Sequence, residues 1–332
     1  MRVVFCGSGK FAVPSLRAIA AGGDEIVCVI TQPARPAGRG GKVSGKKKPT
    51  PVAAAAGELE IPAERIVEQP DINAEQSLTA IRQLEPDTIC VVDFGQIVGE
   101  DVRRAASWGA FNLHGSLLPA LRGAAPVNWA IIRGHKRTGV TTFLLVDRID
   151  AGPIYVQREV EIDPQQTALE LRDRLAEVGA EAVCDTLELL SAGRAKGRRQ
   201  DELLATFAPK LTKADGRIDW TADAETVRNL IHGTWPWPGG QTIFCRKARR
   251  AADVQLVIAS ASAEPSAESN EPGHIDSDFA VATGKGRLRI LEIKPAGKKL
   301  MSWRDFINGY RVTRGDCFIR SGSVRAGPAG PD

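Results

Sequence analysis

Long apolar runs are missing from this chain of 332 residues. No stretch approaches the roughly 18 residues that a membrane-spanning helix needs, and glycine and lysine interrupt the first ten residues too early for a signal peptide. Hydrophobic residues make up 43% and charged residues 25%, the balance of an ordinary soluble protein. We therefore expect a cytoplasmic protein that is long enough for two domains.

Cysteine and histidine are sparse. The six cysteines include no CxxC pair, so neither a zinc site nor a disulfide framework is indicated, and buried free thiols are expected. Only four histidines occur, and none has neighbours typical of a metal site. No metal is therefore expected.

Acidic residues are absent between Glu25 and Glu58, where six cations occur: Arg35, Arg39, Lys42, Lys46, Lys47 and Lys48. A second segment, 285–311, has eight lysines and arginines against two acidic residues. The net charge of the whole chain is only +4. Two local basic segments on a nearly neutral protein indicate a polyanionic partner, and an ordinary solvated surface is the alternative.

Short β-branched runs alternate with helical patterns in the first half of the chain. Strands are predicted at 2–6, 25–31, 88–94 and 109–115, and a long amphipathic helix at 167–190 closes this domain. This alternation predicts an α/β domain with a Rossmann-like parallel sheet covered on both faces. The turn GSG lacks the third glycine of a dinucleotide site, because Ala12 stands there.

The second half has short strand candidates separated by turns, which predict a small β-barrel or sandwich. They lie at 240–248, 253–260, 279–284 and 287–293. Residues 261–272 lack periodicity and are predicted to form a mobile loop. The expected organisation is a catalytic domain at 1–192, a linker at 193–206, a second domain at 207–324 and a flexible tail at 325–332.

The stretch FNLHGSLLPALRGAAP contains His114 near the end of a predicted strand. Asn112 lies two residues earlier and therefore on the same strand face as His114. The alternative is that His114 has only a structural role, as a lone histidine commonly does. The next apolar run ends in Asp147 and Asp150, followed by an Ala-Gly-Pro turn. An amide, an imidazole and a carboxylate suit acyl transfer to an amine. No serine or cysteine lies in a recognisable nucleophile elbow, which favours direct transfer to the amine over a covalent enzyme intermediate.

Longer motifs resemble a known family. FNLHGSLLPALRGAAPVNWAI with VDRIDAGPI is similar to the signature of the 10-formyltetrahydrofolate-dependent formyltransferases. TQPARPAGRGGKVSGKKKPTPV resembles the branch that formylates methionyl initiator tRNA, and FAPKLTKADGRIDW, WPWPGG and KPAGKKLMSWRDF resemble its OB-like C-terminal domain. The resemblance implies formyl transfer from 10-formyltetrahydrofolate to the tRNA-bound methionine for translation initiation, through a tetrahedral intermediate.

The resemblance also implies roles for individual residues. The catalytic trio would be Asn112, His114 and Asp150. The folate site would comprise Ser116, Leu117, Leu118, Pro119, Phe94, Gly95, Gln96, Ile97 and Asp147. Asp93 departs from the family pattern, in which a small apolar residue is expected, and this affects the detail of the folate pocket.

The implied partner is the acceptor stem of the tRNA. Its expected contacts are Arg39, Lys42, Lys46, Lys47, Lys48, Lys298 and Lys299, with the basic loop becoming ordered on RNA. The resemblance implies a monomer. Two alternatives are a formyltransferase acting on sugar nucleotides and a non-catalytic RNA-binding protein that keeps the Rossmann-like domain as a scaffold.

Overall fold

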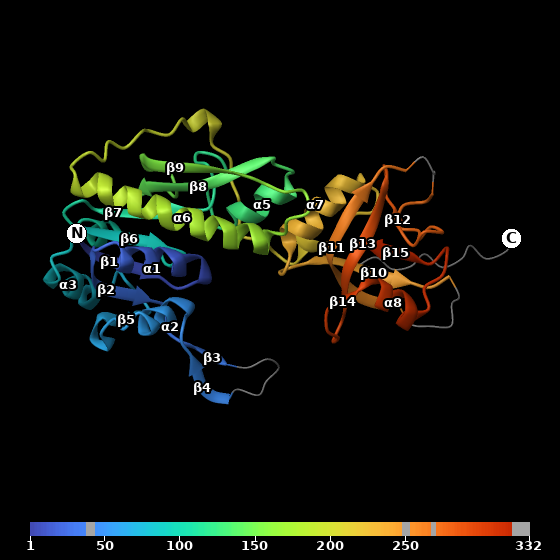
Figure 1. The fold of residues 1–332 in the computed structure, drawn as a ribbon, viewed down its shortest axis with the longest axis horizontal. Coiled ribbons are helices and arrows are strands. Elements are labelled where there is room, and N and C mark those ends of the chain that lie inside the picture. Colours follow the sequence, from blue (N-terminus) through green and yellow to red (C-terminus); the bar gives the residue numbers. More distant parts are fainter. Residues whose placement is uncertain (38–43, 248–252, 267–269, 321–332) are drawn as a thin grey trace. The chain divides into compact units, whose positions relative to one another are not determined.

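The computed structural model describes residues 1–37, 44–247, 253–266 and 270–320 (Figure 1). Its contacts divide the chain into two compact units. Unit 1 comprises Met1–Pro126, Arg137–Glu161 and Arg172–Ala208, and unit 2 comprises Val127–Lys136, Ile162–Leu171 and Pro209–Asp332. No helix within the described ranges is long and apolar enough to cross a membrane.

Unit 1 is built on a seven-stranded sheet with the strand order β5-β2-β1-β6-β7-β8-β9. Its strands are β1 (Arg2–Gly7), β2 (Glu25–Thr31), β5 (Ile66–Glu68), β6 (Thr88–Val92), β7 (Ala110–His114), β8 (Arg137–Leu144) and β9 (Ile154–Glu161). The strands from β5 to β7 are parallel, which confirms the Rossmann-like α/β prediction. Strand β8 differs from it, because it is antiparallel to both β7 and β9, so that β9 again runs in the direction of β7.

Helices surround this sheet. They are α1 (Val13–Ala21), α2 (Pro51–Glu58), α3 (Glu75–Gln83), α4 (Glu100–Arg103) and, from Arg172 onward, α6 (Ala168–Ser191). Helix α5 (Pro126–Ile132) belongs to unit 2 apart from its first residue. Helix α6 packs closely on one sheet face, since a Cβ on Gly179 would lie 2.6 Å from Leu113 Cδ2. The hydroxyl groups of Thr142 and Thr186 also join β8 to α6 at 2.6 Å. Because side chains alternate along a strand, Asn112 and His114 lie on the opposite face of β7.

Unit 2 contains an antiparallel sheet with the order β12-β13-β11-β10-β15, with β14 paired to β13. Its elements are α7 (Ala224–Thr234), β10 (Gly240–Cys245), β11 (Val254–Glu264), β12 (Val281–Ala282), β13 (Arg287–Pro295), β14 (Met301–Ser302), α8 (Trp303–Tyr310) and β15 (Cys317–Arg320). A bridge between His274 and Cys317 and a hydrogen bond from Phe318 N to Gly273 O join the two ends of the sheet. The result is the nearly closed barrel that the OB-like prediction required.

Aromatic side chains fill the core of unit 2. Trp220 stacks on Phe318 with ring centroids 5.5 Å apart, and Phe244 meets Phe306 edge to face at 5.4 Å. The prediction of a loop at 261–272 was wrong in its first part, because β11 continues to Glu264. Those residues pair with the start of β13, where apolar and polar residues alternate. The sequence analysis did not predict helices α7 and α8.

Candidate active site

His114 ends β7 with its imidazole buried on the face away from α6. The Nε2 atom lies 2.9 Å from the carbonyl oxygen of Leu121. Since a carbonyl only accepts hydrogen bonds, Nε2 carries a proton and donates it to Leu121 O. The Nδ1 atom then faces the carboxylate of Asp150, with 3.7 Å between Nδ1 and Oδ2.

Asp150 reaches this position through a loop that folds back after β8. Because β8 is antiparallel to β7, its end lies beside the start of β7 rather than beside His114. From the sequence, His114 and Asp150 would lie close together because each ends one of two neighbouring strands. This reason is wrong, although the two side chains do lie close together. Asp150 adopts a left-handed φ of 52°, and its Oδ2 accepts a hydrogen bond of 2.7 Å from Gly123 N. The following Gly152 passes so close to Leu144 that a Cβ would lie 1.7 Å from its carbonyl oxygen.

Asn112 is partly exposed on the same strand face. Within the part of the chain that the structure describes, its side-chain amide has no hydrogen-bond partner. It is therefore available to donate to an oxygen atom beside His114. An amide donor, an imidazole and a carboxylate close to it could together stabilise an oxyanion and transfer a proton.

The segment expected to line the folate site is largely turned inward. Ser116 is buried, and its hydroxyl donates to Ala120 O at 2.6 Å. Leu118 is buried and its N–H donates to Thr141 Oγ1 at 3.1 Å, while Leu117 and Pro119 are partly buried. The Leu118-Pro119 peptide bond is cis. These residues thus shape the loop between β7 and α5.

The loop after β6 is also tied to its surroundings. Phe94 is buried, and Gly95 has a positive φ of 79°. Gln96 donates to Gln69 O at 2.7 Å and accepts from Ile72 N at 2.8 Å, so both ends of its amide are engaged. Ile97 is 77% exposed. Of this set, Ile97 alone presents a large side chain to solvent.

A cavity of about 610 Å³ opens between α4 and the loop after β8. Its lining residues are Glu100, Arg103, Arg104, Ala106, Ser107, Gly109, Ala110, Leu144, Leu145, Val146 and Asp147. Only Asp147 was predicted as a folate-site residue. Arg103 was missed, and it forms an ion pair with Asp147 and also donates to Val98 O at 3.2 Å. No local motif marks Arg103, because its ion-pair partner Asp147 is 44 residues away in the chain.

Asp93, the departure noted in the sequence, covers the turn after β1. Its carbonyl oxygen accepts from Ser8 N and Gly9 N, and a Cβ on Gly9 would lie 1.7 Å from Asp93 Oδ2. Asp93 is exposed as a residue, but desolvation of its carboxyl group against the turn raises its pKa, and the charge of Arg172 opposes this. In this position the Asp93 carboxylate occupies the space that a side chain at position 9 would need. Its side chain is directed to that turn and is absent from the cavity lining.

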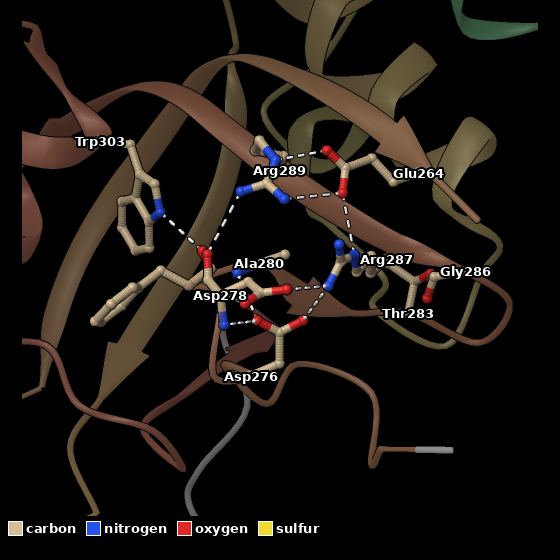
Figure 2. Close-up of polar contacts among 10 residues, drawn as sticks. Glu264, Asp276, Asp278, Ala280, Thr283, Gly286, Arg287, Arg289 and Trp303 are labelled. Carbon is tan, nitrogen blue, oxygen red and sulfur yellow. Dashed lines mark hydrogen bonds and ion pairs between the residues drawn. The ribbon is translucent and has the colours of Figure 1, made fainter. Parts of the chain in front are cut away.

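The basic segment 285–311 contains two arginines that are already neutralised (Figure 2). Arg287 is paired with Glu264, Asp276 and Asp278 at 3.0 to 3.2 Å. Arg289 is bound to the same Glu264. Hydrogen bonding from Arg289 lowers the pKa of Glu264.

The remaining predicted RNA contacts can be placed only in part. Lys298 and Lys299 are exposed in the turn after β13, and Lys48 is exposed at the end of β4. Lys46 and Lys47 belong to β4 (Ser44–Lys48), which pairs with β3 (Arg35–Ala37). Arg39 and Lys42 lie outside the described residues, as do the rest of segment 38–43 in the loop 35–48 expected to become ordered on RNA, and the predicted tail at 325–332. No group of three metal-ligating side chains occurs among the described residues.

Comparison with known proteins identifies the class. The family model described as formyl transferase matches residues 1–187, and that of its C-terminal domain matches residues 210–311. The chain therefore belongs to the formyl transferase family and is a transferase enzyme. A methionyl-tRNA formyltransferase from Geobacter sulfurreducens is 37% identical over 328 residues, which cover 98% of both chains. Another from Moorella thermoacetica is 40% identical over 320 residues, 95% of this chain and 98% of that one. The family resemblance seen in the sequence is thus confirmed.

Solved structures agree on the fold. An N-formyltransferase from Helicobacter canadensis, in complex with folinic acid and dTDP-3-aminofucose, has a TM-score of 0.64 and 14% identity, over 89% of this chain and 99% of that chain. HypX from Aquifex aeolicus, in complex with tetrahydrofolic acid, has a TM-score of 0.62 and 17% identity, over 93% of this chain and 47% of that chain. At such identities the likeness establishes the fold alone.

Proposed function

We propose that this enzyme transfers the formyl group of 10-formyltetrahydrofolate to the α-amino group of methionyl initiator tRNA. The relatives named methionyl-tRNA formyltransferase, similar over nearly the whole chain, support the choice of acceptor. The observation that carries the chemistry is the approach of Asp150 to His114, 3.7 Å apart, on the strand face that also presents Asn112.

The reaction proceeds by direct attack of the amine. A free α-amine has a pKa of roughly 7.7 to 8, so the neutral form is accessible near pH 7. Its nitrogen forms a bond to the formyl carbon, and the oxyanion is stabilised by Asn112 and by His114 protonated at Nδ1, because the Nε2 proton is already donated to Leu121 O. The bond from this carbon to the folate nitrogen then breaks, and the proton lost by the amine passes to that nitrogen with the help of Asp150.

The cavity beside β7 suits the folate ring system. Ala110 lines it, and Ala110, Asn112 and His114 follow one another on the same strand face at about 6.6 Å spacing. A ring bound there would direct its formyl group along the strand toward the catalytic trio. The volume of about 610 Å³ lies within the usual range for ligand sites. In this proposal the site is supported by residues that do not contact the folate themselves: Phe94, Gln96, Ser116 and Leu118.

Two variants test the catalytic roles. Loss of one oxyanion donor typically costs about 100- to 1000-fold in rate, so His114→Ala and Asn112→Ala should each lower turnover of methionyl-tRNA by about that much. Circular dichroism and the melting temperature would show that the variants are folded. Wild-type turnover by folded His114→Ala would disprove the assignment.

The acceptor is tested by offering two amines to the enzyme with radiolabelled 10-formyltetrahydrofolate. Label should appear in methionyl-tRNA and not in a UDP-amino sugar. Label only in the sugar would support a sugar-nucleotide formyltransferase. RNA binding without label in either product would support the non-catalytic alternative.

The acceptor stem of the tRNA is contacted by Arg39, Lys42, Lys46, Lys47, Lys48, Lys298 and Lys299, with Arg39 as the chief contact of the basic loop to the terminal base pair. Replacing Lys298 and Lys299 with alanine should weaken tRNA binding and reduce its salt dependence, because each phosphate contact releases about one counterion. Arg289→Gln is the matched control, since this arginine is already bound to a carboxylate. An unchanged salt slope for the lysine variant would exclude these contacts.

The enzyme acts as a monomer in the cytoplasm, where its substrate is used for translation initiation. Sedimentation at working concentrations should give a mass near 35.6 kDa. A catalytic domain at 1–192, a linker at 193–206 and a tRNA-binding domain at 207–324 remain the proposed organisation.

A further inference from the structure

The segment after α6 is bonded along unit 1. Arg198 exchanges two main-chain hydrogen bonds of 2.8 Å with Ile154. Farther on, Arg122 N donates to Thr206 O at 2.8 Å and Ala208 N donates to Arg122 O at 2.7 Å. This segment therefore connects the loop that follows His114 with the start of β9, just after the loop that contains Asp150.

Gln200 occupies the middle of this segment, and its amide is fully used. Nε2 donates to the carbonyl oxygens of Asp150 and Gly152, both at 2.8 Å. Oε1 accepts from Arg122 Nε at 3.1 Å and from Arg122 Nη2 at 2.8 Å. Since an amide has two N–H donors and two lone pairs, these contacts fix a single orientation of the group.

Arg122 in turn is fixed by Glu202. The guanidinium is only 2% exposed, and it binds both carboxylate oxygens of Glu202 at 3.0 Å. Such bidentate pairs define geometry more strictly than single hydrogen bonds. Glu202 also accepts from Arg148 at 2.6 Å, and the hydrogen bonds from Arg122 and Arg148 lower the pKa of Glu202 to about 2. The carboxylate is therefore ionised wherever the enzyme would act.

The conformation that Gln200 holds is one that a non-glycine residue rarely adopts. Asp150 has a φ of 52°, in the left-handed region that residues other than glycine disfavour. Hydrogen bonds to the carbonyls of Asp150 and Gly152 restrain the main chain at Asp150 and two residues beyond it. The carboxylate of Asp150 is restrained separately by Gly123 N.

We propose that Gln200 is a positioning residue for catalysis: it holds Asp150 in the left-handed turn that brings its carboxylate to His114, while Arg122 and Glu202 fix the amide. This inference rests on the proposed function, in which Asp150 and His114 take part in formyl transfer. Gln200 itself touches neither substrate nor reacting atoms.

The test variant is Gln200→Glu, which keeps the size and the acceptor for Arg122 but replaces the two donors with an oxygen facing two carbonyl oxygens. The control is Gln241→Glu in unit 2, where the native amide also donates to two carbonyls, those of Lys213 and Pro238. Misplacement of a catalytic group by about 1 Å can cost about 100-fold, so kcat for methionyl-tRNA should fall about 10- to 100-fold in Gln200→Glu. The KM for the formyl folate should stay within about twofold, and the control should behave as wild type.

A purely structural role would not produce the expected coupling. In an Asp150→Asn background, Gln200→Glu should lower kcat by less than about twofold, because the group it positions is already disabled. The same fold-loss in both backgrounds, or a loss confined to KM, would overturn the inference. If Gln200→Glu does not fold, Gln200→Met removes the same two donors without adding charge, and the same expectations apply.

The proposed function and the positioning role of Gln200 are disproved by different results. Wild-type turnover by folded His114→Ala and Asp150→Asn would defeat the proposed function. Strong losses in those two variants with wild-type kcat in Gln200→Glu would defeat only the positioning role.

Discussion

His232 makes unit 2 sensitive to acid. Its imidazole belongs to α7 and is 1% exposed, and its Nε2 accepts a hydrogen bond of 3.2 Å from Ala261 N on β11. Accepting this bond requires an unprotonated Nε2. Burial, assisted by the charge of Arg228, lowers the pKa of His232 from 6.5 to about 4.

The size and sign of the effect follow from proton linkage. Below pH 6.5 the unfolded chain binds a proton at this residue that the folded protein does not bind, so the unfolded state gains stability. The contribution of His232 is therefore fully present above this pH and is lost progressively as the pH falls toward about 4. At about pH 5 the loss is about 2 kcal/mol, using about 1.36 kcal/mol per pKa unit.

Urea unfolding followed by tryptophan fluorescence measures this loss. Wild type and His232→Gln would be compared at about pH 7.5 and about pH 5, because glutamine can still accept from Ala261 N but does not titrate. Between the two pH values, the free energy of unfolding should fall by about 2 kcal/mol more in wild type than in the variant. An equal fall in both proteins would refute a buried, neutral His232.

Three further predictions rest on close contacts. Gly9→Ala should lower the melting temperature, since its Cβ would lie 1.7 Å from Asp93 Oδ2. Adding Asp93→Gly should recover most of the loss, and strictly additive effects of the two substitutions would contradict this. Thr242→Val removes a hydroxyl that accepts from Trp220 Nε1 at 3.1 Å and donates to a carbonyl at 2.8 Å. In urea unfolding, the free energy of unfolding of Thr242→Val should be lower than that of wild type by about 1 to 3 kcal/mol. A decrease below about 0.5 kcal/mol would contradict the role of these two hydrogen bonds. Burial raises the pKa of the Cys28 thiol to about 11, so it should react with Ellman's reagent at about pH 8 only after unfolding, and a Cys28→Ser protein should react identically in the native state.

The strand that holds the active site could be predicted from sequence because its pattern is local. Phe111 and Leu113 alternate with Asn112 and His114, and the period of two places the polar pair on one face. The structure has the same arrangement, with Leu113 against α6. The resemblance to the family supplied the identity of the trio, which the alternation alone leaves open.

The path of Asp150 could not be predicted in the same way. A sequence of β-branched runs does not reveal that β8 is antiparallel, and the meeting with His114 depends on a loop that folds back over the sheet. Likewise, Gln200 is 50 residues from Asp150 in the chain, and Arg103 is 44 residues from Asp147. Such pairs are set by tertiary packing, and neither has a local motif.

Counting cations along the chain overstates the charge available to RNA. Segment 285–311 has eight cations, but Arg287 and Arg289 face the three carboxylates of Glu264, Asp276 and Asp278. With two arginines and three carboxylates this cluster is net negative, so its arginines are already engaged and offer little positive charge to a phosphate. Lys298 and Lys299, in the turn at the other end of that strand, have no such neighbours among the described residues. The phosphate backbone of the tRNA should therefore contact that turn, and a survey of arginine and lysine variants along β13 should find its effect on binding concentrated there.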